Sequence, residues 1–246
     1  MTKTLRHTWE GFYPLIIYSV MLTVVAEALN RYTPIHDYSP MLAQAVTEAV
    51  CLIPMLYFYF KVAYSKSKVK NPVTDIVMIV LVSVFLSVGL NNLIALSPLR
   101  EMSKHFNRIN STVYSDGKLF QILAVGICAP ILEEVTFRGI LFGNLRKGFG
   151  KIIAIFASAL VFGAMHHNIV QFIYATGLGV AFAYIYEKMG ALWSCILAHS
   201  AANLFSLVAT WYGISGFLTK SDTICMVSGI IGCIVSVVLL LRWRKV

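Results

Sequence analysis

The sequence predicts an all-α, polytopic membrane protein of about eight transmembrane helices that form one bundle around a buried polar cavity. Of its 246 residues, 58% are hydrophobic and only 13% are charged, whereas a soluble domain carries about 25% charged residues. The apolar residues are gathered in long runs, a pattern that excludes a soluble globule and a disordered chain. A helix that crosses the hydrocarbon core needs about 20 mostly apolar residues.

Eight stretches are predicted to span the membrane. They are residues 12–29, 41–64, 73–97, 119–142, 152–166, 169–186, 191–211 and 223–241. The fifth is the shortest. The first lacks a small-residue cleavage site, so we expect it to remain as a helix rather than to be removed as a signal peptide. We interpret residues 1–246 as a single membrane domain, and the longest polar connection, residues 98–118, as a solvated connector, with an amphipathic or gating segment as the alternative.

The basic residues predict the orientation, because Lys and Arg are retained on the cytoplasmic side. With the N-terminus inside, the inner segments hold 13 Lys and Arg and the outer segments hold 6, while Arg138 falls within a span. We therefore expect both termini to be cytoplasmic, with the end Arg242-Trp243-Arg244-Lys245 at the headgroup layer. The brevity of the chain and the absence of an organellar signal predict a prokaryotic plasma membrane. Although the net charge is +9, the charges lie between the apolar runs, so the expected partner is the lipid bilayer and not nucleic acid.

Ionisable residues inside the predicted spans are the candidates for function, because charges there are costly and usually face a wet cavity. They are Glu27, Glu48, Glu133, Glu134, Arg138, His166 and His199. Glu27 and Glu48 lie toward the outer side, and we interpret them as snorkelling or structurally hydrogen-bonded residues.

The fourth span contains two adjacent glutamates. Their side chains point about 100° apart on a helix, so we expect them to have different tasks. Glu134 and Arg138 have the i,i+4 spacing of a helical ion pair. Glu133 has no local counter-charge and is a candidate general base. Pro130 is expected to kink the helix, to free a carbonyl group and to make room for water.

Partners for Glu133 are predicted on two other spans. His166 ends the fifth span, one turn after Phe162, and His199 and Asn203 lie one turn apart on the seventh. At about 1.5 Å per residue, Glu133, His166, His199 and Asn203 all lie about 16–22 Å from the nearest cytoplasmic charge. We therefore expect these four side chains to meet in one polar layer.

The ordered set Glu133-Glu134-x-x-x-Arg138, Phe162-x-x-x-His166 and His199-x-x-x-Asn203 resembles the signature of the CAAX-protease and bacteriocin-processing family, also called the Abi or type II CAAX prenyl endopeptidase family. The resemblance covers residues 119–206, which it marks as the catalytic core. It implies a glutamate-dependent intramembrane endopeptidase without a metal.

The resemblance also implies roles for the six motif residues. Glu133 and His166 would activate a water molecule. His199 and Asn203 would bind the oxyanion, and Glu134 and Arg138 would orient the site. These roles agree with the needs of amide hydrolysis, which are a base for water and donors aimed at the developing negative oxygen.

The reading from the residues leaves alternatives open. A catalytic zinc held by Glu133, His166 and His199 is one, although the usual H-E-x-x-H spacing is missing. The expected substrate is a membrane-presented peptide or protein: a prenylated C-terminus, a secreted peptide or a bacteriocin precursor. The other function classes are a non-proteolytic immunity or peptide-binding protein and a proton-coupled transporter. The absence of internal duplication argues against transport.

Overall fold

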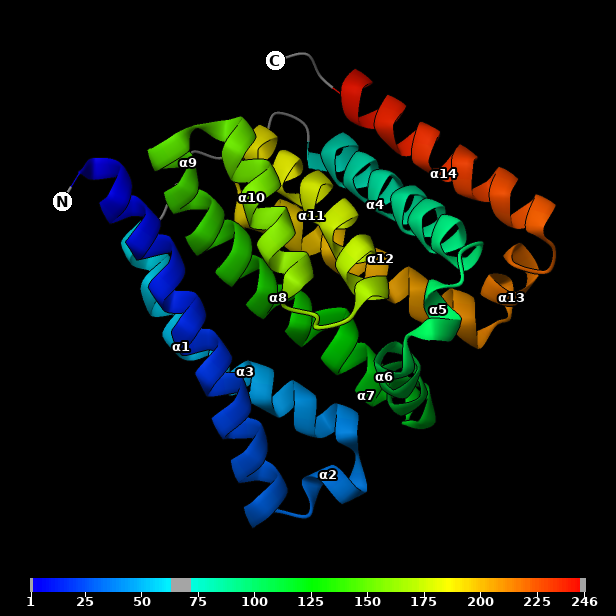
Figure 1. Ribbon diagram of the computed structural model, residues 1–246, viewed down its shortest axis with the longest axis horizontal. Coiled ribbons are helices and arrows are strands. Elements are labelled where there is room, and N and C mark those ends of the chain that lie inside the picture. Colours follow the sequence, from blue (N-terminus) through cyan, green and yellow to red (C-terminus); the bar gives the residue numbers. More distant parts are fainter. Residues whose placement is uncertain (1, 63–71, 244–246) are drawn as a thin grey trace.

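The computed structural model describes residues 2–62 and 72–243, and within those ranges it contains helices and no strand (Figure 1). Seven helical segments of the described chain are long and apolar enough to cross a membrane. They are Lys3–Tyr32 (α1), Pro40–Val62 (α3), Pro72–Ala95 (α4), Lys118–Phe149 (α7 to α9), Ile169–Met189 (α11), Leu192–Trp211 (α12) and Asp222–Arg242 (α14). The predicted class of fold, a polytopic all-α membrane protein, is confirmed.

The predicted fifth span, residues 152–166, differs from the other seven. It corresponds to α10, Lys151–Ala164, which has 14 residues. Such a helix is about 21 Å long, less than the hydrocarbon core of about 30 Å. The apolar run of the sequence is therefore shorter than a full span, and the turn that follows α10 places His166 within the bundle beside a cavity.

The connector of residues 98–118 is more structured than we expected. It forms two short helices, Leu99–Met102 (α5) and Lys104–Ser115 (α6). Asp116 then fixes the start of α3: its carboxylate accepts hydrogen bonds from Ser39 Oγ at 2.7 Å and from the Met41 N–H at 2.9 Å. Burial alone would raise the pKa of Asp116, but these bonds and one from the Gly117 N–H outweigh it and lower the pKa.

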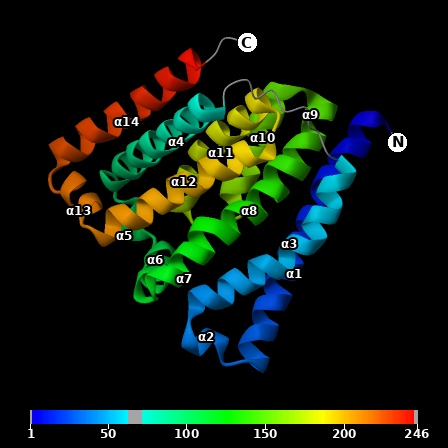
Figure 2. The same cartoon turned by 180° about the vertical axis from the view of Figure 1, so that it is seen from behind.

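The helices are arranged side by side around the long helix of residues 118–149. On one side, α1 and α3 pack against each other and against this helix, with Ile35–Tyr38 (α2) joining them (Figures 1 and 2). On the other side lie α10, α11 and α12, then α4, and finally α14, which packs on α4. Ile214–Leu218 (α13) connects α12 to α14. The segment that carries the two glutamates is thus the centre of the bundle.

The outer surface is apolar, as expected for contact with lipid. Ile16 of α1, Phe156 of α10 and Ile234 of α14 expose 59%, 55% and 57% of their surface. A soluble monomer rarely exposes such continuous apolar faces. These faces are the surface that the bilayer would cover.

The ends that carry most of the basic residues lie together at one end of the bundle. The N-terminus of α1, the C-terminus of α14 and Gly143–Phe149 (α9) all lie at the upper end of the bundle in both views (Figures 1 and 2). Arg146 forms an ion pair with Glu187 at the end of α11, and Lys188 donates to the Trp243 carbonyl. Of the basic end expected at the headgroup layer, Arg244 and Lys245 lie outside the described residues, as do Lys66, Lys68 and Lys70 of the connection before α4.

Gly163 allows α10 and α11 to pack at close range. A Cβ atom at this position would lie 2.2 Å from Thr176 Oγ1 and 2.7 Å from the Phe172 carbonyl oxygen. A Gly163→Ala protein is therefore expected to lose about 1–3 kcal/mol of stability, because the backbone of α11 must shift. Thermal unfolding in detergent measures this loss. The matched control is Gly148→Ala, where the nearest atom lies at 3.6 Å; equal effects of the two changes would contradict the prediction.

Candidate active site

The long helix of residues 118–149 changes its winding around the two glutamates. Two wide, π-helical stretches, Ile122–Cys128 and Val135–Phe142, flank the regular segment Ala129–Glu134 (α8). Wide turns of this kind are rare and are frequent at functional sites, because they change the direction of side chains. Glu133 and Glu134 lie at the end of the regular segment, directly before the second wide stretch.

Pro130 leaves a backbone carbonyl without its helical donor, as its position predicts, and Asn203 compensates for this. In the winding of the first wide stretch, each N–H bonds the carbonyl five residues before it, as Ala129 does to Ala124. Pro130 has no N–H, so the Val125 carbonyl would lack its donor. Asn203 Nδ2 of α12 donates to this carbonyl at 2.8 Å. A side chain from a distant helix therefore completes the backbone hydrogen bonding of the helix that carries Glu133.

Glu134 and Arg138 form the predicted ion pair at the centre of the bundle. The Arg138 Nη1 to Glu134 Oε1 distance is 3.0 Å, and neither side chain is exposed. Arg138 Nη2 also donates to the Gly179 carbonyl at 3.2 Å, and the guanidinium lies 4.4 Å from the centre of the Phe162 ring. A charge buried this deeply needs such partners. The pair therefore fixes α11 and α10 relative to the helix of the glutamates.

His199 links the two glutamates. Its Nδ1 lies 2.8 Å from Glu134 Oε1, and its Nε2 lies 3.8 Å from Glu133 Oε2. The ring stacks on Phe182 with 5.1 Å between centroids, and Phe162 contacts it edge-on at 5.8 Å. Because a carboxylate only accepts hydrogen bonds, Nδ1 carries the proton that points to Glu134. Nε2 is then the ring atom available to Glu133.

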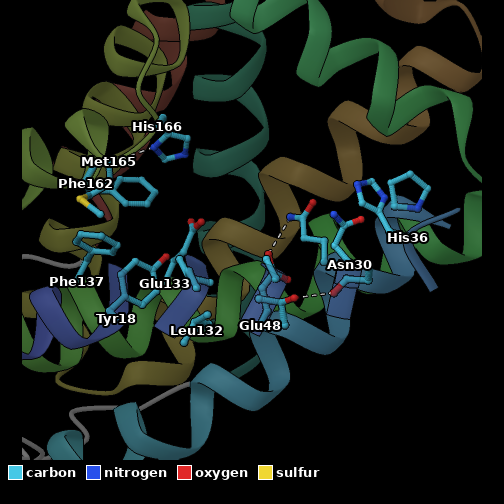
Figure 3. Close-up of a pocket in the computed structure, with 16 residues that line it drawn as sticks. Tyr18, Asn30, His36, Glu48, Leu132, Glu133, Phe137, Phe162, Met165 and His166 are labelled. Carbon is cyan, nitrogen blue, oxygen red and sulfur yellow. Dashed lines mark hydrogen bonds between the residues drawn. The ribbon is translucent and has the colours of Figure 1, made fainter. Parts of the chain in front are cut away.

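Glu133 and His166, which are 33 positions apart in the sequence, line the same cavity of about 410 Å³ (Figure 3). Glu133 exposes 20% of its side chain, in contrast to the fully buried Glu134. His166 lies in the turn after α10, and its Nδ1 bonds the Phe162 carbonyl at 3.0 Å. A carbonyl accepts only, so His166 Nδ1 also carries a proton and Nε2 is free to act in the cavity.

The turn between α10 and α11 positions His166. His167, the next residue, has a φ of 56°, a left-handed conformation that is uncommon for a residue other than glycine. Asn168 then caps α11, with its side-chain oxygen accepting the Gln171 N–H at 2.9 Å. The reversal of the chain at His167 thus lets α10 and α11 pack closely while His166 stays beside the cavity.

Asn203 does not lie where we expected it. The sequence places it at the same depth as the other three residues and one turn from His199. In the structure its amide donates a hydrogen bond to the Val125 carbonyl, and Asn203 lines a second cavity, distinct from the cavity of Glu133. Depth along a helix does not fix the direction around its axis, so the layer argument could not distinguish these two directions. The structure brings together Glu133, His166 and His199, with Glu134 and Arg138 behind them.

An Asn203→Ala protein is expected to lose about 1–3 kcal/mol of stability, because the Val125 carbonyl is then unpaired in the bundle. Thermal unfolding in detergent measures this effect. A matched control is Asn107→Ala, because that amide also donates to a carbonyl, at 3.1 Å, but at an exposed position. A stability loss no larger than the control's would contradict the assigned role of Asn203.

Glu48 has the structural hydrogen bond that was one of our two interpretations of this residue, but its position in the cavity of Glu133 was not predicted. This residue of α3 lines the same cavity as Glu133 and is only 7% exposed, so it does not snorkel to the surface. Its Oε1 accepts a hydrogen bond from Gln44 Nε2 at 2.8 Å. The spacing of Gln44 and Glu48, four residues apart in an apolar span, was the available signal. This spacing places Gln44 and Glu48 on one face of a helix, but it does not show which other helix that face packs against.

The site contains glutamate and histidine side chains, which are types that can bind a metal ion. Within the described parts of the chain, no group of three or more His, Cys, Asp or Glu side chains is arranged to hold a metal ion. In His199 and His166, one ring nitrogen each is already used by Glu134 and by the Phe162 carbonyl. The second nitrogen of each ring, together with Glu133, is the part of the site that remains for chemistry.

The fold and the site define a polytopic helical membrane protein in which Glu133 and His166 line a cavity and His199 lies beside Glu133. Residues 115–205 match the family model described as "Type II CAAX prenyl endopeptidase Rce1-like". This match covers less than half of the chain, and the matched range includes all six predicted site residues. The resemblance predicted from the motifs is confirmed over this range.

Two relatives extend this comparison. The chain is 30% identical over 102 residues to "Putative membrane peptidase YdiL" of Bacillus subtilis (strain 168), a match that covers 42% of each chain. It is 25% identical over 165 residues to "UPF0177 protein YxdF" of Lactococcus lactis subsp. lactis (strain IL1403), which covers 63% of this chain and 88% of the relative. The match thus spans about two fifths of the Bacillus relative's length. No solved structure matches the chain.

Proposed function

We propose that the protein is an intramembrane endopeptidase in which Glu133 and His166 activate a water molecule to hydrolyse a peptide bond. The observation that carries the proposal is that these two side chains, one from α8 and one from the turn after α10, line one cavity (Figure 3). The match to the Rce1-like family model and the similarity to a protein named as a membrane peptidase support it.

The proposed reaction begins with a water molecule between Glu133 and His166. The Glu133 carboxylate takes one proton of the water, and the neutral Nε2 of His166 accepts a hydrogen bond from the other. The water oxygen forms a bond to the carbonyl carbon of the substrate. The C–N bond then breaks, and the proton held by Glu133 passes to the leaving nitrogen, so that one water and one peptide bond give a carboxyl group and an amine.

His199 is proposed to stabilise the negative oxygen that develops on the substrate. Its Nδ1–H is held by Glu134, so a protonated ring directs its Nε2–H toward the side of Glu133. Arg138 balances the charge of Glu134 and holds it in place. In this proposal Asn203 contributes through the Val125 carbonyl, by completing the helix that holds Glu133, and direct contact with the oxyanion would require its amide to leave that carbonyl.

The experiment is to reconstitute the purified chain in lipid vesicles and to incubate it with a mass-encoded library of short capped peptides. Defined cleavage products by mass spectrometry are the expected result. A Glu133→Gln preparation, purified in parallel, controls for contaminating proteases. Equal products from both preparations, or none from either, would overturn the proposal. Binding of a peptide without cleavage by the native protein would favour the immunity or peptide-binding alternative.

The same preparation tests the metal alternative. A zinc enzyme built on Glu133, His166 and His199 requires about one zinc per active chain, and a chelator would remove its activity. The proposed metal-free mechanism predicts cleavage that is unchanged by the chelator and unrelated to zinc content. Total-metal analysis and activity after chelation distinguish the two.

The proposed setting is a prokaryotic plasma membrane with both termini in the cytoplasm. The start of α1, the end of α14, α9 with Arg146 and the end of α11 with Lys188 lie at one end of the bundle, which supports this orientation. The substrate is proposed to be a peptide or protein presented at the membrane, either with a prenylated C-terminus or as the precursor of a secreted peptide or bacteriocin.

A further inference from the structure

A second carboxyl group shares the cavity of Glu133 and has no assigned task. Glu48 of α3 lies between the end of the cavity that holds Glu133 and the end that holds His36 of α2 (Figure 3). Its Oε1 is held by Gln44, while its Oε2 is buried and has no hydrogen-bond partner among the described residues. Native proteins rarely leave a buried polar atom unpaired, so such an atom indicates a missing partner.

The missing partner is a donor, and the charges around the cavity indicate a cationic one. Two carboxyl groups, Glu48 and Glu133, line the cavity, and the described residues that form its wall include no Lys or Arg. A cation is attracted strongly where the surroundings are poor in water, because Coulomb interactions are weakly screened there. The Gln44 bond fixes Glu48 in one geometry before a ligand arrives, which lowers the entropy that binding must overcome.

We propose that Glu48 binds a Lys or Arg side chain of the substrate, close to the bond that is cut, and so sets the specificity of the site. This inference rests on the proposed peptidase function. The donor of the basic side chain approaches Oε2, and the peptide backbone then extends along the cavity toward Glu133 and His166. Glu48 is a specificity-determining residue in this proposal, whereas Glu133 performs the chemistry.

The test uses the full chain in lipid vesicles and the same peptide library. Bonds cut by the native protein are expected to have Lys or Arg at one fixed position nearby. For a selected peptide, replacing that residue by the neutral norleucine is expected to lower kcat/KM at least about tenfold, because hydrogen bonds to charged groups are strong. The change is expected mainly in KM, since the basic group binds and does not react.

The Glu48→Gln protein keeps the shape of the side chain but removes its charge. It is expected to cut the two peptides with kcat/KM values within about threefold of each other. Thr47→Val is the matched control, because Thr47 lines the same cavity but its hydroxyl is already bonded to the Ala43 carbonyl at 2.8 Å. This control is expected to keep the native preference.

The outcomes separate the inference from the function on which it rests. If the native protein cuts peptides without preference for a basic residue, the inference is overturned and the peptidase function stands; this measurement needs no variant and holds even if Glu48→Gln does not fold. A preference that survives in a folded Glu48→Gln protein also overturns the inference. If the native protein cuts nothing, the peptidase function fails first, and the inference fails with it.

Discussion

A Glu133→Gln protein is expected to reach the membrane in normal amounts and to cut peptides at least about 100-fold more slowly than the native protein. The substitution keeps the size of the side chain and removes its ability to accept a proton. A positioned general base contributes about 10²–10⁴-fold to a rate, and the effect should fall on kcat. Because Glu133 exposes 20% of its side chain and lines a cavity, the structure around it should tolerate the amide.

The matched control for this change is Glu101→Gln, the same substitution at an exposed residue of α5. Glu101 does not line the cavity. We expect native activity from it. The measurement is the rate of product formation from one selected peptide in lipid vesicles at equal protein content. Activity of Glu133→Gln within about fivefold of the control would remove Glu133 from the proposed role of base.

An Arg138→Met protein is expected to be less stable by about 3–5 kcal/mol, because removing one partner of a buried pair leaves the other charge uncompensated. Arg138 is not exposed at all, and besides Glu134 it holds the Gly179 carbonyl of α11. The loss of Arg138 should also lower the catalytic rate, because Arg138 holds Glu134 in place and Glu134 orients the ring of His199. Unfolding by a graded addition of a denaturing detergent, followed by intrinsic fluorescence, measures the stability.

The double change Glu134→Gln with Arg138→Met provides the control. It removes both charges, so it should recover much of the stability that the single change loses. It should not recover activity, because an amide in place of the Glu134 carboxylate would no longer hold the ring of His199 through a charged acceptor. A single variant with native stability, or a double variant less stable than the sum of the two single losses, would contradict the role that we assign to the pair.

The sequence was sufficient for the fold class and for interactions within one helix. Apolar runs of sufficient length identify most of the spanning helices, and the i,i+4 spacing of Glu134 and Arg138 gives their ion pair directly. The short helix α10 and the helices of residues 98–118 were harder to predict from the sequence. α10 is mostly apolar but shorter than a full span, and the connector is rich in polar and charged residues, so its helices resemble a solvated loop in composition.

Interactions between helices were only partly predictable. The depth of a residue along a helix places it in a layer, and this was sufficient to group Glu133, His166 and His199. The direction of a side chain around its helix axis depends on how the helices rotate against one another, which a single sequence does not give. For this reason the bond from His199 to Glu134, the turn of Asn203 toward Val125 and the position of Glu48 in the cavity required the structure.

The contact between Asn203 and Val125 has a consequence for the order in which the protein is assembled. Chains enter the membrane from the N-terminus during synthesis, so residues 118–149 are inserted well before α12 exists. Until then the Val125 carbonyl faces lipid or neighbouring helices without its donor, at a considerable cost. The backbone hydrogen bonding of the helix of the glutamates is therefore completed only when Leu192–Trp211, in the last quarter of the chain, has been made.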